Sequence, residues 1–320
     1  MISASDGVTA KRSLRASLIW LRCAQCSGTN NAISFHTFLC FLKLLQGSYY
    51  NNPLYDRPFD DEKVIKEFPS FTSPNIWPSQ EVPQLETAFK ELGRLIIDVG
   101  TLLAMHCDKY VKSIAPSYED GRLTRVLHTG RCVKARLLHY FPCDSAETKD
   151  DPWAKVNEED LGSWCGFHND HGSLTGLCCA MYLDPQGKEV PCPDPKAGLY
   201  VRSRKGELIK AGFPSDHLAF QMGETHQIHS GGLLLATPHC VRAATGAAAK
   251  GISRETFAVF MEPLWDEPMD IPAGLTAEDA LRGTSRQYLP RGVPPLGKRW
   301  QTGIDFGDFT KRTLKEYTIY

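Results

Sequence analysis

The sequence predicts a mainly β fold with flanking helices. Residues 131–265 contain short apolar runs separated by polar or glycine- and proline-rich breaks, which is typical of strands joined by turns. One long segment before this region has helical periodicity, and the chain after Pro263 is rich in proline and glycine. Short strands with polar turns over this length favour a double-stranded β-helix, the jelly-roll architecture that cupins also have.

Residues 1–46 form an atypical basic extension. No acidic residue occurs between Asp6 and Asp56, whereas Lys11, Arg12 and Arg15 accompany several serines. This composition suits either an organelle-targeting segment or a disordered extension, and the two interpretations carry equal weight. We expect a cytoplasmic protein, with an organelle as the alternative location.

Residues 47–130 form a predicted helical region in front of the β region. Its clearest helix spans 83–113, and Pro83 suits the first turn. A stripe of this kind predicts a helix that packs on the outside of the β region. The apolar residues that recur at alternating steps of four and three are Leu85, Phe89, Leu92, Ile96, Val99 and Leu103.

Strands are expected throughout residues 131–265, with breaks at 144–160, 184–187 and 191–198. Residues 266–320 are expected to be an extension that covers this core. A short helical piece near 277–282 and a closing tail through Phe309 and Tyr317 belong to it.

His168, Asp170 and His239 form the candidate metal-ligand set. An imidazole and a carboxylate two residues apart on a strand project to the same side, and a second imidazole from a distant strand can complete a triangular face. This is the ligand set of a non-haem Fe(II) oxygenase. Three ligands leave the opposite face of an octahedral ion open for a chelating cosubstrate and O2, which a closed structural zinc site would not allow.

Around these ligands the chain resembles the isopenicillin-N-synthase-like branch of the 2-oxoglutarate and Fe(II)-dependent dioxygenases. The resemblance covers residues 134–263. The matching stretches follow the order of the family: residues 139–142, 168–177, 221–227, 236–241 and 254–263.

The resemblance implies that His168, Asp170 and His239 bind Fe(II) and that 2-oxoglutarate chelates the metal. Arg254 then binds the far carboxylate of 2-oxoglutarate through two parallel hydrogen bonds, and Thr256, two residues along the strand, adds a hydroxyl. The implied reaction converts 2-oxoglutarate and O2 to succinate and CO2 and oxidises a C–H bond of a small organic substrate. Hydroxylation is the default outcome, with desaturation or ring closure as alternatives.

The sequence departs from the family pattern in four places. Thr256 stands where the family usually has a serine, a mild change that keeps the hydroxyl. His139 and Phe141 stand where the family has an asparagine and a tyrosine, so either His139 contacts 2-oxoglutarate or the cosubstrate binds more weakly. Residues 246–251 lengthen a hairpin loop, which costs little. Family members also carry an N-terminal strand that joins the main sheet, and we find no counterpart of it in this sequence.

Other residues have less specific explanations. We expect His171 to lie beside the site or at the surface, and His226 and His229 to be solvated loop residues. Eleven cysteines indicate free thiols in a reducing compartment, and Cys23 with Cys26 forms a single pair, too few for a zinc ribbon. Five aromatic residues are candidates for a substrate lining, although core packing suits most of them better: Trp164, Phe167, Tyr200, Phe220 and Trp265.

Composition limits the classes of partner. The net charge of -1 gives no electrostatic reason to expect nucleic acid. The apolar stretches at 17–20 and 38–45 are far shorter than the roughly 20 residues of a membrane-spanning helix. We expect a monomer that acts on a small molecule. Two alternatives remain open: a catalytically impaired jelly-roll binding protein, and a cupin-type metalloenzyme that does not use 2-oxoglutarate.

Overall fold

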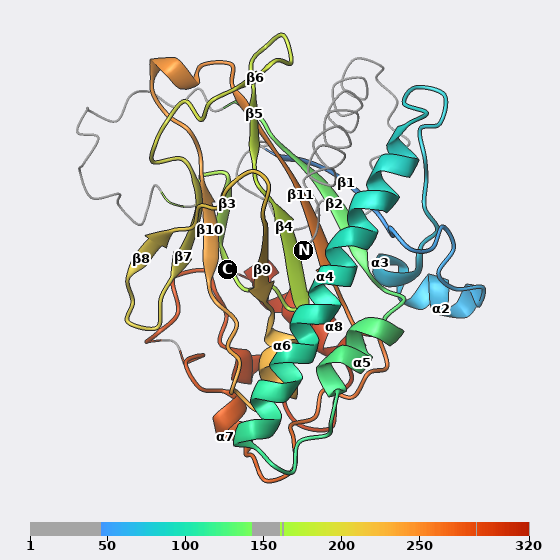
Figure 1. The fold of residues 1–320 in the computed structure, drawn as a ribbon. Coiled ribbons are helices and arrows are strands. Elements are labelled where there is room, and N and C mark those ends of the chain that lie inside the picture. Colours follow the sequence, from blue (N-terminus) through green and yellow to red (C-terminus); the bar gives the residue numbers. More distant parts are fainter. Residues whose placement is uncertain (1–45, 143–160, 162, 286, 320) are drawn as a thin grey trace.

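The structure is a computed structural model that describes residues 46–142, 161, 163–285 and 287–319. Two antiparallel sheets form its centre (Figure 1). The prediction of a mainly β fold with flanking helices is thereby confirmed. The larger sheet has the order β1-β2-β11-β4-β9, with β5 and β6 joined to it through β11, and the smaller has the order β3-β10-β7-β8. The strands are β1 (Gln46–Asn51), β2 (Lys134–Tyr140), β3 (Cys165–His168), β4 (Leu174–Cys178), β5 (Met181–Leu183), β6 (Glu189–Val190), β7 (Gly198–Arg202), β8 (Leu208–Lys210), β9 (Leu218–Met222), β10 (His239–Arg242) and β11 (Ser253–Met261).

The long predicted helix is present as α4 (Leu85–Ile114), which runs obliquely across the outer face of the larger sheet (Figure 1). It packs very closely on β4, because a Cβ atom added at Gly176 would lie 2.2 Å from Cγ2 of Ile96. The other helices are α2 (Glu62–Glu67), α3 (Pro69–Thr72), α5 (Arg122–Thr129), α6 (Glu224–His229), α7 (Ala277–Ala280) and α8 (Phe306–Ile319), with two short 3-10 turns at Ala247–Ala249 and Leu296–Lys298.

Strand β1 corrects one expectation from the sequence. It pairs with β2 in antiparallel register from Gln46 opposite Tyr140 to Asn51 opposite Ala135, so an N-terminal strand does join the main sheet. Its sequence, QGSYYN, mixes two tyrosines with residues that are poor strand formers, and sheet context overrides that local preference. The basic extension before residue 46, the Cys23 and Cys26 pair and the predicted break at 144–160 lie outside the described residues.

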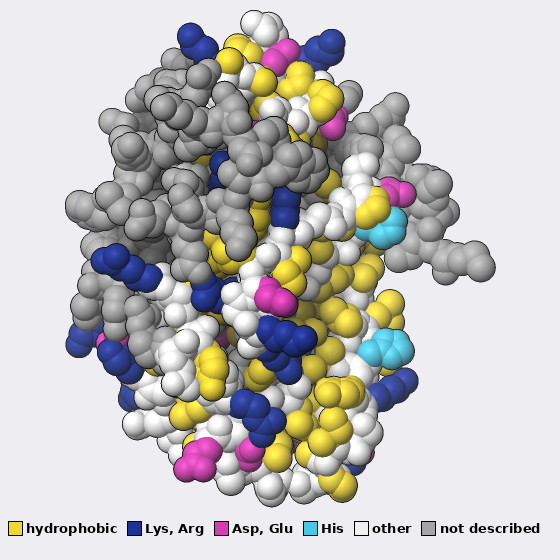
Figure 2. All heavy atoms as spheres, turned by 90° about the vertical axis from the view of Figure 1, so that its left-hand side faces the viewer, with side chains coloured by type: hydrophobic (Ala, Val, Ile, Leu, Met, Phe, Trp, Pro, Cys, Tyr) yellow, Lys and Arg dark blue, Asp and Glu magenta, His cyan; other side chains and the backbone are white. Residues whose placement is uncertain are grey.

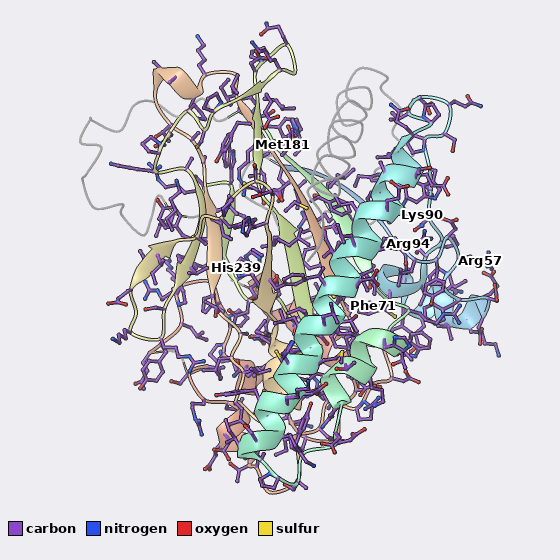
Figure 3. All side chains as sticks on the ribbon, in the orientation of Figure 1. Arg57, Phe71, Lys90, Arg94, Met181 and His239 are labelled. Carbon is purple, nitrogen blue, oxygen red and sulfur yellow. The ribbon has the colours of Figure 1, made fainter. Side chains whose placement is uncertain are left out.

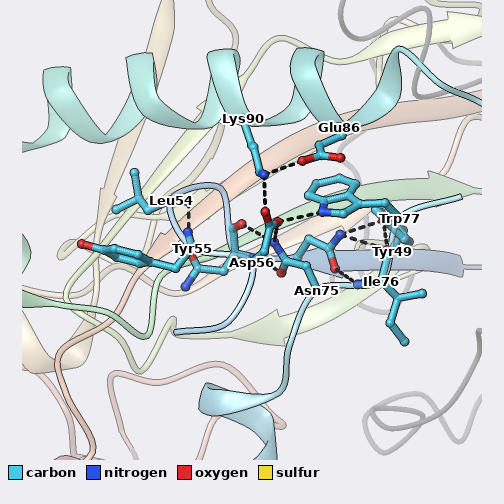
Figure 4. Close-up of polar contacts among 11 residues, drawn as sticks. Tyr49, Leu54, Tyr55, Asp56, Asn75, Ile76, Trp77, Glu86 and Lys90 are labelled. Carbon is cyan, nitrogen blue, oxygen red and sulfur yellow. Dashed lines mark hydrogen bonds and ion pairs between the residues drawn. The ribbon is translucent and has the colours of Figure 1, made fainter. Parts of the chain in front are cut away.

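A polar network fastens the segment between β1 and α4 to that helix (Figure 4). Asp56 accepts hydrogen bonds from Trp77 Nε1 at 2.8 Å, Asn75 Nδ2 at 3.0 Å and Lys90 Nζ at 2.7 Å. Lys90 also donates to Glu86 at 2.6 Å. Burial opposes ionisation of Asp56, but the three donors outweigh burial and lower its pKa. The network therefore holds Asp56, Asn75 and Trp77 together beside α4.

Side-chain alternation on β11 decides which residues face the space between the sheets. Phe257, Val259 and Met261 belong to the apolar cluster under α4. Ala258 and Phe260 belong instead to a cluster with Val241 and Leu199 of the smaller sheet, as do Leu138 and Tyr140 of β2. Because side chains on a strand alternate between faces, Arg254 and Thr256 share the inner face with Ala258.

Residues that follow β11 pack with α6. Phe306 and Phe309 of α8 pack with Trp300, Met269 and Ile228 in a third buried cluster. On the face turned toward the viewer in Figure 2, lysine and arginine side chains are interspersed with apolar and acidic ones. In the part of the chain that the structure describes, no helix has the length and apolar character needed to cross a bilayer.

Candidate metal centre

His168, Asp170 and His239 come together at one point between the sheets. His168 ends β3 and His239 begins β10, and these two residues are register partners across the strand pair. His239 is marked in Figure 3. One ligand atom from each of the three residues lies within 4.8 Å of the others, and they are the only such group of at least three His, Cys, Asp or Glu among the described residues.

The ring nitrogens are oriented for a shared ion. Nδ1 of His168 lies 2.8 Å from the Gly166 carbonyl oxygen, and Nδ1 of His239 lies 3.1 Å from the Thr237 carbonyl oxygen. When both Nδ1 atoms donate to these carbonyls, the two Nε2 atoms are the ones that can bind an ion once His168 has lost its second proton. They point toward Asp170 Oδ1, at 3.9 and 3.8 Å.

These separations fit a common metal ion. Two donors that each lie about 2.1 Å from one ion can be at most ~4.2 Å apart. The second oxygen of Asp170, Oδ2, accepts a hydrogen bond from the Thr175 hydroxyl at 2.7 Å, which fixes the carboxylate and leaves Oδ1 for the ion. Nitrogen and carboxylate donors with an open face suit a divalent transition metal such as Fe(II).

The electrostatics of the three residues are coupled. Burial would raise the pKa of Asp170, but the imidazoles of His239 and His168 and the hydrogen bond from Thr175 lower it overall. Burial and the neighbouring His168 lower the pKa of His239 to about 4, so this imidazole is neutral. Burial opposes protonation of His168, yet Cys165 and Asp170 raise its pKa to about 9. A metal ion would therefore displace a proton from His168.

Arg254 forms a second buried feature on the inner face of the larger sheet. Its side chain lies beside the ring of Tyr140, at 5.0 Å from the guanidinium carbon to the ring centroid, and it is hydrogen-bonded to the Tyr182 hydroxyl. Only 7% of Arg254 is exposed, and its Nε and Nη1 have no hydrogen-bond partner among the described residues. A buried cation with two unused donors is costly unless an anion completes it. Thr256, also buried, lies on the same face.

The structure does not bring His139 to Arg254. Register pairs His139 with Glu255 and Tyr140 with Arg254, so His139 lies on the opposite face of the sheet. There its Nδ1 lies 2.7 Å from Glu255 Oε1, and its ring packs edge-on against Phe141. The prediction that His139 contacts 2-oxoglutarate followed the family pattern, whereas the alternation of side chains along β2 places Tyr140 on the inner face. Tyr140 and Tyr182 therefore flank the cation instead of His139.

His226 and His229 are not solvated loop residues, which corrects that prediction. Both lie on α6 and are fully buried, and burial lowers the pKa of His226 to about 4 and that of His229 well below its ordinary value. His229 Nε2 lies 3.0 Å from the Pro268 carbonyl oxygen. His171 lies beside the site, as expected, with its ring stacked on Phe306 at 5.6 Å and its Nε2 3.9 Å from Glu262.

Gln221 is a residue that the sequence did not single out as part of the site. It lies on β9 opposite Thr175, and its Nε2 is 3.5 Å from His239 Nε2. Its Oε1 is buried and has no hydrogen-bond partner among the described residues. The alternation of β9 could have indicated its orientation, but only the pairing of β9 with β4 shows that it reaches the ligands.

The five aromatic candidates for a substrate lining all pack in apolar clusters. Trp164 packs between the sheets, Phe220 packs under α4, and Trp265 stacks on Phe68. Phe167 and Tyr200 pack together with Leu161 on the outer side of the smaller sheet. Core packing, the better-suited explanation, therefore accounts for all five.

Glu262 predicts a measurable pH effect on stability. It follows β11, and burial raises its pKa to about 7 from an ordinary value of 4.5, against the nearby charge of Lys134. Between these two pH values the unfolded chain loses the proton and the folded protein retains it, so the free energy of unfolding falls as pH rises from about 4.5 to about 7. A pKa difference of this size corresponds to about 3 kcal/mol.

Between pH 5 and pH 8, the free energy of unfolding of the Glu262→Gln variant should fall by about 3 kcal/mol less than that of the wild type, as measured by urea unfolding. Glu91→Gln, an exposed position on α4, serves as the control and should behave like the wild type. Equal pH dependence in Glu262→Gln and the wild type would show that the Glu262 carboxyl ionises normally.

Comparison with known proteins gives a consistent fold. No family model and no curated protein matches the sequence. A protein assigned to the 2OG-Fe(II) oxygenase family from Caulobacter crescentus is similar in structure, with a TM-score of 0.61 and 17% identity over 98% of this chain and 87% of that chain. A full-length Neurospora crassa protein, solved in complex with alpha-KG and thymine, has a TM-score of 0.54 and 15% identity over 100% of this chain and 85% of that one. The dioxygenase for auxin oxidation of rice has a TM-score of 0.52 and 15% identity, over 98% of this chain and 82% of that chain. The chain therefore has the fold of the 2OG-Fe(II) oxygenases, in agreement with the resemblance seen in its sequence.

Proposed function

We propose that this protein is an Fe(II)- and 2-oxoglutarate-dependent dioxygenase that oxidises a small organic substrate, by hydroxylation as the default, and releases succinate and CO2. The observation that carries the proposal is the convergence of His168, Asp170 and His239, with the Nε2 atoms of both imidazoles and Oδ1 of the carboxylate facing a common point. Bound Fe(II) would supply the activation of O2 and the oxidative decarboxylation of 2-oxoglutarate, which protein side chains cannot perform.

The protein would contribute position and charge. Thr175 holds the Asp170 carboxylate in one orientation, and the carbonyls of Gly166 and Thr237 hold the two imidazoles. Such outer contacts fix the ligands before the metal arrives and reduce the reorganisation needed on binding. Gln221, beside His239, can donate a hydrogen bond to a group bound on the open side of the centre.

Arg254 would bind the far carboxylate of 2-oxoglutarate. Its unused Nε and Nη1 donors can make two parallel hydrogen bonds to a carboxylate, and Thr256 can add a third donor on the same face. Arg254 also shares this face with Phe260, which is paired with Thr175, the residue that holds Asp170. The cation and the residue that holds Asp170 therefore lie on the same face of the larger sheet.

The substrate class rests on the surroundings of the centre. The His168 side chain is 31% exposed, whereas those of Asp170 and His239 are 8% and 5% exposed, so solvent reaches the centre from the β3 side. We further propose that the two sheets are the halves of a double-stranded β-helix spanning 131–265, because their inner faces share one apolar cluster.

The proposal of a small organic substrate is supported by the Neurospora crassa protein, which was solved with thymine, and by the rice enzyme of auxin oxidation.

An anaerobic titration tests the use of 2-oxoglutarate. Wild-type protein with Fe(II) should develop a weak visible charge-transfer band when 2-oxoglutarate is added. Arg254→Ala should still bind the metal but should bind 2-oxoglutarate about 100-fold more weakly, because two charge-assisted hydrogen bonds are lost. Arg204→Ala, which changes an exposed arginine after β7, should titrate like the wild type.

The same titration separates the alternatives. Absence of metal binding by the wild type would favour a binding protein without turnover. Metal binding with no spectral response to 2-oxoglutarate, and no effect of Arg254→Ala, would favour a cupin-type metalloenzyme. Release of succinate in air in the presence of a metabolite extract, with a product that gains one oxygen, would then identify the substrate.

A further inference from the structure

The C-terminal extension reaches the segment that carries two of the candidate metal ligands. Asn169 stands between His168 and Asp170, and its backbone N–H donates a hydrogen bond to the Tyr317 hydroxyl of α8 at 3.0 Å. The two residues are 148 positions apart in the chain. Figure 1 shows α6 and α8 near each other in the lower part of the molecule.

A fully buried ion pair holds the other side of Asn169. The Asn169 side chain, 5% exposed, donates from Nδ2 to Glu224 Oε1 at 3.0 Å. Glu224 is 1% exposed and accepts two hydrogen bonds from Arg299, which is completely buried, at 2.6 and 2.7 Å. Arg299 also donates to the Thr313 hydroxyl of α8 at 3.1 Å and to the Pro294 carbonyl at 3.0 Å. One guanidinium therefore connects α6, α8 and the segment before the 3-10 turn at Leu296–Lys298.

Helix α6 holds the backbone of the same ligand segment. The Glu224 N–H donates to the Asp170 carbonyl at 2.8 Å, and the Thr225 N–H donates to the Gly172 carbonyl at 3.2 Å. The Thr225 hydroxyl donates to the His171 carbonyl at 2.6 Å. The position of Asp170 is thus set by contacts with α6, and the position of α6 is set by Arg299.

Stability alone is a weak explanation for this arrangement. Removing two charges from water offsets most of their mutual attraction, so a buried ion pair contributes little net stability compared with apolar packing. Its directional hydrogen bonds do fix geometry. Every partner of Asn169 named above belongs to α6 or α8, and Asn169 is the residue that separates two ligands by the spacing the metal centre needs.

We propose that residues 294–317 are a positioning element of the metal centre, and that metal binding and the packing of α8 against the ligand segment are thermodynamically coupled. This inference rests on the proposed function only in that it requires a metal at His168, Asp170 and His239. Coupling of this kind is reciprocal: contacts from α8 raise metal affinity, and bound metal protects α8 from opening by the same factor.

The test uses the full-length protein and Ni(II), a redox-stable substitute for Fe(II), measured by isothermal titration calorimetry. Tyr317→Phe removes the hydroxyl that accepts from Asn169 but keeps the ring, and should weaken Ni(II) binding about tenfold, as is usual for outer contacts of metal ligands. Asn169→Ala, which removes the link to Glu224 but keeps the backbone N–H, should weaken it similarly. Tyr110→Phe, an exposed tyrosine on α4, should have no effect.

Hydrogen exchange supplies a readout that a merely structural role would not change. In the wild type, Ni(II) should slow exchange of the backbone amides of 306–317, and this metal-dependent protection should shrink in Tyr317→Phe. The inference would be overturned if Tyr317→Phe and Asn169→Ala both bound Ni(II) as tightly as the wild type does. It would also be overturned if Ni(II) did not change hydrogen exchange in α8 of the wild type. Either result would leave the proposed function standing. Failure of the wild type to bind Ni(II) would count against the proposed function itself.

Discussion

Replacing His239 with alanine is expected to abolish specific metal binding, with an affinity loss well above the roughly 100-fold that accompanies loss of an outer contact. His239 is neutral because burial and the neighbouring His168 lower its pKa to about 4, and its Nδ1 lies 3.1 Å from the Thr237 carbonyl oxygen. Its Nε2 is therefore free to bind an ion. Without it, only His168 and Asp170 remain, and two ligands two residues apart do not form a face of an octahedron.

Calorimetric titration with Ni(II) or Co(II) measures this loss, and thermal unfolding of the metal-free protein shows whether the fold is retained. His217→Ala is the matched control, since its side chain is 62% exposed and pairs only with its neighbour Asp216 among the described residues. His239→Ala protein that is folded and binds the metal as tightly as the wild type would exclude His239 as a ligand.

Replacing Gly223 with alanine is expected to damage both stability and the metal centre. A Cβ at this position would lie 2.0 Å from the Gly172 carbonyl oxygen and 3.1 Å from the Asp170 carbonyl oxygen. Both atoms belong to the backbone of the ligand segment, so the clash cannot be relieved by turning a side chain. We expect about 3 kcal/mol of destabilisation from the overpacking and at least tenfold weaker metal binding from the displacement of Asp170.

Urea unfolding and Ni(II) titration measure the two effects of Gly223→Ala separately. Gly212→Ala, where an added Cβ would meet no atom within 4 Å, controls for the loss of a glycine in itself. Unchanged stability and affinity in Gly223→Ala would mean that α6 can move away from the ligand segment, and would also weaken the case for its role in holding Asp170.

The sequence predicted those parts of the fold that have a regular local pattern. The stripe that includes Leu85, Phe89 and Ile96 has helical spacing, and α4 follows it closely. Strand β1 has no such pattern, because its pairing partner, β2, lies more than 80 residues away and supplies what QGSYYN lacks. Likewise, His226 and His229 look polar in sequence, and only the packing of α6 against distant segments, α5 among them, buries them.

The site was predictable where its spacing is local. His168 and Asp170 are two residues apart on an extended segment, and the structure brings His239 to them through strand pairing. The sequence did not show which side chains of β2 face the space between the sheets. His139 and Tyr140 are neighbours in the chain, so they lie on opposite faces of the sheet. Gln221, Glu224 and Arg299 could not be found from local sequence at all, because their roles arise from contacts between distant segments.

The pairing of β1 with β2 also affects how much of the chain can be omitted. In the described part of the protein, β1 ends the larger sheet and covers the backbone edge of β2 over six register pairs. A truncated chain that starts after Asn51 would leave the outward amides and carbonyls of β2 unpaired. Exposed edges of this kind recruit strands from other molecules and lead to aggregation. Shortened versions for crystallisation or expression should therefore retain Gln46 and the residues that follow it.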